Sequence, residues 1–76
     1  MKFRIEHEIQ DRMRIHMAQA HMSYAQADIL AYYLQTQDMV LQVKVYDRTA
    51  DVSISYQGDR EELLKSIQRF HYEDVE

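Results

Sequence analysis

Residues 40–56 read Val-Leu-Gln-Val-Lys-Val-Tyr-Asp-Arg-Thr-Ala-Asp-Val-Ser-Ile-Ser-Tyr, and the strand pairing is predicted from this segment. Apolar and polar residues alternate through Val43 and Val45, and they alternate again from Val52 to Tyr56. Such a period of two is typical of strands that bury one face. The intervening Asp-Arg-Thr-Ala-Asp is polar turn material, so we expect two antiparallel strands joined in a hairpin.

An amphipathic helix is predicted before this hairpin. Four apolar residues fall at i, i+3, i+4 and i+7, the stripe of a helix that packs one face on a core: Ala27, Leu30, Ala31 and Leu34. Ser23 with Gln26 reads as a capping box, in which each side chain satisfies a free backbone donor at the helix start. This helix should run from about Tyr24 to Thr36.

A second helix is predicted after the hairpin. Gly58 breaks the preceding strand, and Asp59 with Glu62 is typical of a helix cap. The apolar stripe that follows consists of Leu63, Ile67 and Phe70, with Leu64 at its edge. The tail from His71 to Glu76 alternates weakly through Tyr72 and is a candidate for a last strand.

The first eighteen residues also have the period of a half-buried strand, with one parity mostly apolar and the other mostly charged. Polar His7 and Asp11 interrupt the apolar set. Residues 2–18 therefore form either one long bent strand or two strands joined near Gln10 and Asp11.

Two helices and about four strands of this length bury their apolar faces only as a two-layer α+β sandwich. Both helices should cover one face of an antiparallel sheet, because the apolar residues are too few for a second core. The expected order is strand, helix, strand, strand, helix, strand. By parity the open face of the sheet carries eight side chains: Arg12, Arg14, His16, Gln42, Lys44, Tyr46, Ser53 and Ser55.

Composition narrows the function classes. The 76 residues are expected to form one domain, 1–76. The sequence has no cysteine, which excludes disulfide scaffolds and thiolate metal sites and favours a reducing compartment. A net charge of -4 argues against nucleic-acid binding. No apolar run approaches the roughly 20 residues of a membrane span. The acidic pairs Glu6/Glu8 and Glu61/Glu62 imply no pocket, so no enzymatic role is expected for this chain alone.

The chain resembles the heavy-metal-associated domain over roughly residues 15–76. The resemblance rests on the hydrophobic spacing from Val40 onward together with Thr49, Tyr56 and Tyr72. The opening residues resemble a divergent branch of that family at the N-terminus of metal-translocating P-type ATPases, which often begins with His followed by Gly-Arg-x-Arg. Here Asp11 stands at the glycine position. The family fold is a ferredoxin-like βαββαβ sandwich, which matches the order expected above.

The family's metal site is absent from this sequence. Its members bind soft cations through Met-x-Cys-x-x-Cys between the first strand and the first helix. In this register Ser23 and Gln26 stand where the two cysteines would be. Neither side chain supplies the thiolate that makes such a site tight.

The same loop offers a different ligand set, in which imidazole and thioether together suit Cu(I) or another soft or borderline metal: His16, Met17, His21 and Met22. The alternative is that both methionines pack in the core while the histidines are solvated.

On the open face, Arg12, Arg14 and Lys44 with Tyr46 are candidates for binding an acidic partner. The alternative is a solvated strand face balanced by nearby acids.

Two functions follow as expectations. The first is a non-catalytic regulatory or docking domain of a heavy-metal-transporting P-type ATPase, located at the cytosolic face of the membrane through its parent chain. Its partners would be the transporter's other cytosolic domains or a metal carrier. The second is a free-standing cytoplasmic ferredoxin-like binding protein, either a His/Met metal carrier or a homodimer formed through a sheet edge.

Overall fold

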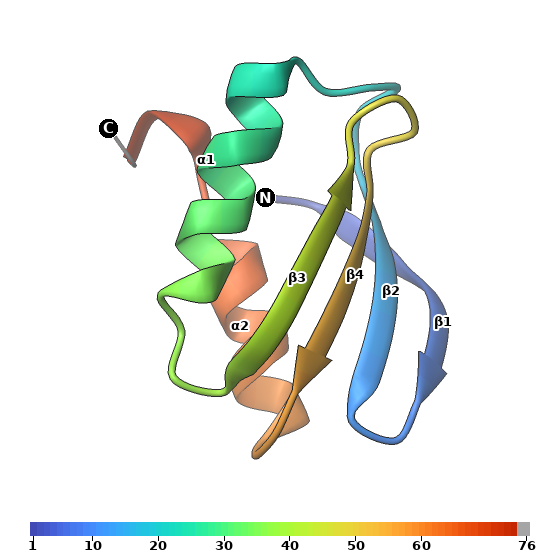
Figure 1. Cartoon of the computed structure of the whole chain (residues 1–76), viewed down its shortest axis with the longest axis vertical. Coiled ribbons are helices and arrows are strands. Elements are labelled where there is room, and N and C mark those ends of the chain that lie inside the picture. The colour runs from blue at the N-terminus through green and yellow to red at the C-terminus, as the bar shows by residue number, and fades with distance from the viewer. Residues whose placement is uncertain (75–76) are drawn as a thin grey trace.

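A computed structural model describes residues 1–74, which form seven segments of regular structure (Figure 1). The elements in chain order are β1 (Phe3–Ile9), β2 (Arg12–Met17), α1 (Tyr24–Gln35), β3 (Val40–Tyr46), β4 (Asp51–Tyr56), α2 (Arg60–Arg69) and the short 3-10 helix η1 (Tyr72–Asp74).

The four strands make one sheet in the order β1-β2-β4-β3, and every neighbouring pair is antiparallel. Both α1 and α2 lie on the same face of this sheet, so the molecule has two layers (Figure 1). The predicted α+β class is confirmed, and the sheet order is consistent with a ferredoxin-like sandwich.

The N-terminal segment is two strands rather than one bent strand. They are joined by a turn at Gln10 and Asp11, where Asp11 has a φ of 66°, in the left-handed region that favours glycine. The Tyr56 N–H donates to the Asp11 carbonyl at 3.0 Å, which ties this turn to the end of β4. Aspartate tolerates the left-handed conformation better than most residues, so the turn forms without glycine.

The prediction of a strand after the second helix was wrong for the described part of the tail. Residues 72–74 form η1 instead, and residues 75 and 76 lie outside the described residues. The edge position beside β2, which a last strand would have taken, is filled by β1. The observed order is therefore ββαββα.

Both helices begin where the caps were predicted. Ser23 Oγ accepts from the Gln26 N–H at 3.1 Å, and Gln26 Oε1 accepts from the Ser23 N–H at 3.1 Å, a complete capping box. The Asp59 carboxylate caps α2 by accepting from the Glu61 N–H at 2.9 Å. Acidic residues in the first turn of α2 and Arg69 in its last turn interact favourably with the helix dipole.

The core lies between the helices and the sheet. Its largest fully buried side chains come from β2, β4, both helices and the residue that follows α2: Met13, Ile15, Met17, Leu30, Leu34, Val52, Ile54, Leu63, Ile67 and Phe70. The Phe70 ring packs 4.8 Å from Tyr33 and edge-on 5.0 Å from Tyr72, between ring centroids. Within residues 1–74, no helix has the length and apolar character to cross a membrane.

Candidate functional site

The open face of the sheet is the surface that the helices leave uncovered. Polar and charged side chains on this face lie opposite one another across neighbouring strands, in rows that run across the sheet. Strand pairing sets His16 opposite Asp51 and Asp51 opposite Tyr46. The next two rows are Arg14, Ser53 and Lys44, and then Arg12, Ser55 and Gln42. All eight side chains that parity assigned to this face are found there, because the neighbouring residues on each strand point into the core.

A β-bulge in β1 breaks the alternation of that strand. Arg4 pairs with His16 on the open face, and Glu6, two residues further on, points to the same face beside His16. The pairing register then shifts between Ile5 and His7, so His7, which pairs with Arg14, also lies on the open face. One ligating atom from each of Glu6, His16 and Asp51 lies within 4.8 Å of the others. These are the residues that could hold a metal ion on this face.

The charges of that cluster are already matched by protein cations. His16 Nδ1 lies 2.9 Å from Asp51 Oδ1, and the Arg14 guanidinium lies 3.6 Å from Asp51 Oδ2. The carboxylate of Glu6 pairs with Arg4 at 3.7 Å. Two carboxylates that each face an arginine are weak ligands, because a metal ion would have to compete with those cations.

Asp51 is the best-shielded acid of the face, with a side chain 13% exposed. Burial acts to raise the pKa of Asp51, but hydrogen bonds with the side chains of His16 and Thr49 and the charge of His16 lower it overall. Asp51 is therefore ionised at neutral pH and anchors Arg14 and His16 on the sheet.

A shallow hollow of about 240 Å³ lies over β3 and β4 on the same face. Its lining is polar and consists of Arg12, Gln42, Lys44, Tyr46, Ser53 and Ser55. The Tyr46 ring holds two cations, with the Arg14 guanidinium carbon 5.0 Å and Lys44 Nζ 5.3 Å from its centroid. The four predicted partner-binding residues are thus gathered on one surface: Arg12, Arg14, Lys44 and Tyr46.

Comparisons with protein-family models, with curated proteins and with solved structures found no match.

The predicted His/Met ligand set is not assembled. Met17 and Met22 are buried in the core, as the alternative interpretation had it. His16 is the strand neighbour of Met17 and points to the opposite face of the sheet, while His21 is exposed in the loop before α1. Ser23 and Gln26 satisfy one another as a helix cap.

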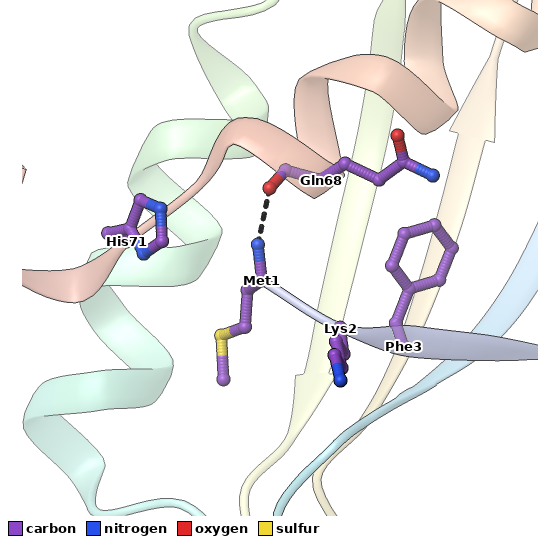
Figure 2. Close-up of a pocket in the computed structure, with 5 residues that line it drawn as sticks. All are labelled: Met1, Lys2, Phe3, Gln68 and His71. Atoms are coloured by element: carbon purple, nitrogen blue, oxygen red, sulfur yellow. Dashed lines mark hydrogen bonds between the residues drawn. The ribbon is translucent and has the colours of Figure 1, made fainter.

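A larger hollow of about 540 Å³ lies where the N-terminus meets the end of α2 (Figure 2). The Met1 amino group donates to the carbonyl of Gln68 at 2.5 Å and to that of Phe70 at 3.0 Å, which satisfies two carbonyls at the helix end. Figure 2 shows His71 on one side of Met1, with Phe3 and the Gln68 side chain on the other. The residues that line this hollow share no common chemistry.

The parity prediction did not place His7 and Asp51 on the open face, and its eight side chains omitted Arg4 and Glu6 although these share the parity of Arg12. Asp51 was read as part of the turn, whereas it begins β4. The bulge that brings His7 onto the face has one sign in the sequence, the polar residue at position 7 among the apolar residues of that parity.

Proposed function

We propose that this chain is a non-catalytic regulatory and docking domain, the N-terminal module of a heavy-metal-transporting P-type ATPase that has no cysteine metal site. The support is the residue spacing shared with the heavy-metal-associated domain, together with a two-layer sandwich of the expected class. ATP hydrolysis and ion movement would belong to the rest of the parent chain, and the domain would sit at the cytosolic face of the membrane.

The observation that carries the docking function is the charge of the open face. The chain has 9 Lys and Arg against 13 Asp and Glu. The open face nevertheless holds Arg4, Arg12, Arg14 and Lys44 against two acids, Glu6 and Asp51. An acidic domain that concentrates cations on one flat surface is suited to an acidic partner surface, since complementary potentials steer association and fix its register.

The helix start supports a docking function over tight metal storage. The side chains of Ser23 and Gln26 are committed to the capping box, and neither is a soft ligand. A metal carrier that visits the domain would therefore meet a protein surface rather than a competing thiolate pair.

Two measurements test the proposal. The native reading frame should continue beyond Glu76 into membrane-spanning segments, and a frame that stops there would contradict the transporter module. The separately expressed cytosolic domains of the parent should then perturb the amide signals of β2, β3 and β4 in the isotope-labelled chain. Arg12→Gln with Arg14→Gln should weaken that binding, whereas Lys65→Gln on α2, at a side chain 61% exposed, serves as the matched control.

The second candidate is a free-standing binding protein that forms a homodimer through β1. This strand is an edge of the sheet, and Ile5 and Ile9 on it are 36% and 51% exposed. An edge strand with apolar side chains is a template for pairing with a second copy. Size exclusion with light scattering separates the candidates, because only the homodimer would give twice the chain mass of 9.2 kDa.

A further inference from the structure

The hollow over β3 and β4 is lined by hydrogen-bond donors. A guanidinium, an ammonium, a primary amide and three hydroxyls face it, from Arg12, Lys44, Gln42, Tyr46, Ser53 and Ser55, and none of these six side chains is a carboxylate. Pairing places Ser55 between Arg12 and Gln42, and it places Ser53 beside Lys44. The two serines therefore form the floor between a cation from β2 and a cation from β3.

The two cations of the hollow are not neutralised by the protein. Over residues 1–74, the ion pairs of Arg and Lys side chains use Arg4, Arg14, Arg60 and Lys65, while Arg12 and Lys44 form none. In the same part of the chain, the hydroxyls of Ser53 and Ser55 have no side-chain hydrogen-bond partner. Two like charges held near one another gain most from a ligand that carries two negative charges.

The size of the hollow restricts the ligand further. Its volume of about 240 Å³ is below the range of roughly 300–1,000 Å³ that drug-sized molecules occupy. A phosphate monoester suits it better, since such a group carries about -1.5 to -2 charges at neutral pH and three strong acceptor oxygens. Arginine can bind two of those oxygens at once, and serine hydroxyls can donate to the third.

From these features we propose that the hollow formed by Arg12, Lys44, Ser53 and Ser55 binds a phosphorylated serine or threonine of a protein partner. This inference rests on the proposed docking function and names the chemistry of the partner. A phosphate on a flat sheet face stays partly in water, so the phosphate alone should bind weakly. A partner segment that lies across the open face adds contacts with neighbours such as Arg14, whose guanidinium is already oriented by Asp51.

The test is a calorimetric and NMR titration of the intact chain with three versions of one peptide with neutral flanks. The central residue is phosphoserine, serine or glutamate, and inorganic phosphate is a separate arm. The phosphoserine peptide should bind about tenfold more tightly than either other peptide and than inorganic phosphate, with shifts centred on Ser53 and Ser55. Arg12→Gln with Lys44→Met should remove that preference, while Lys65→Met should keep it.

The outcomes separate this inference from the docking function. Equal binding of the glutamate and phosphoserine peptides, lost in the Arg12→Gln/Lys44→Met variant, would leave docking intact and overturn the phosphate inference. Inorganic phosphate binding as tightly as the peptide would overturn the assignment to a protein partner. Failure of every peptide, together with failure of the parent domains to bind, would overturn both. Retained amide dispersion in the spectrum of each variant establishes that the fold is intact.

Discussion

Replacing Ser23 and Gln26 together by cysteine tests whether these positions are where the thiolate pair of heavy-metal-associated domains would lie. The change removes two hydrogen bonds of 3.1 Å from the start of α1. Loss of the serine cap costs about 1 kcal/mol, and the second, exposed hydrogen bond adds about 0.5 kcal/mol. A 76-residue domain is stable by roughly 4–11 kcal/mol, so the metal-free variant should remain folded with Tm lowered by about 6–12 °C.

The thiols should more than offset this loss when a soft metal is supplied. Cysteine at a helix N-terminus has a lowered pKa and is therefore readily ionised, and thiolates select Cu(I). A ligand held at 100 times its Kd stabilises the folded state by about 2.7 kcal/mol. The loaded Ser23→Cys/Gln26→Cys variant should thus exceed the unmodified chain in free energy of unfolding by about 1 kcal/mol.

The assay is urea denaturation followed by circular dichroism, under reductant, with Cu(I) buffered by a competing chelator. Ser23→Ala/Gln26→Ala is the matched control, because it loses the same cap and gains no thiol. If the cysteine variant gains no more stability from Cu(I) than the alanine variant, the assignment of these two positions is refuted. If the alanine variant is as stable as the unmodified chain, the capping argument fails instead.

Three further predictions concern the fold. Phe70→Ala should lower the free energy of unfolding by about 3–5 kcal/mol in urea, since it empties the space beside Tyr33; a loss below about 1 kcal/mol would contradict the packing. Asp11→Gly should raise Tm in a thermal melt by relieving a left-handed residue, and a decrease would show that the aspartate side chain is needed there. Glu8, whose pKa is lowered chiefly by its hydrogen bonds from Arg60, should stabilise the fold above its ordinary pKa of 4.5 and lose that contribution as the pH falls. Glu8→Gln should therefore flatten the acid side of a Tm-against-pH curve, and an unchanged acid limb would count against the pair.

The open face was predictable because strand parity depends on local residues alone. Because Ile15 of β2 and Ile54 of β4 point into the core, the residues next to each of them in the strand must point to the opposite face. Parity fails at the bulge, where the consecutive residues Glu6 and His7 both lie on the open face, and the polar residue at position 7 is its one sign in the sequence.

Three other features depend on contacts that the sequence pattern does not contain. The N-terminal segment forms two strands because the backbone of Asp11 is left-handed, and alternation does not reveal that conformation. The edge position beside β2 can be filled from either end of the chain, and both ends alternate. Methionine can either bind a soft metal or pack in a core, so residue type does not distinguish the two roles for Met17 and Met22. In the structure both side chains are buried in the core.

Because the edge strand β1 comes from the start of the chain, next to β2 in sequence, its position also affects the folding rate of the domain. A strand following α2 would have to find β2 across most of the sequence, whereas β1 meets it across the turn at Gln10 and Asp11. Each doubling of a closing loop costs about 0.6 kcal/mol in chain entropy, and folding rates fall as contacts become less local. Pairing of β2 with β4 is then the long-range step of sheet assembly, so substitutions at the Ile15–Val52 pair should slow folding more than substitutions in β1.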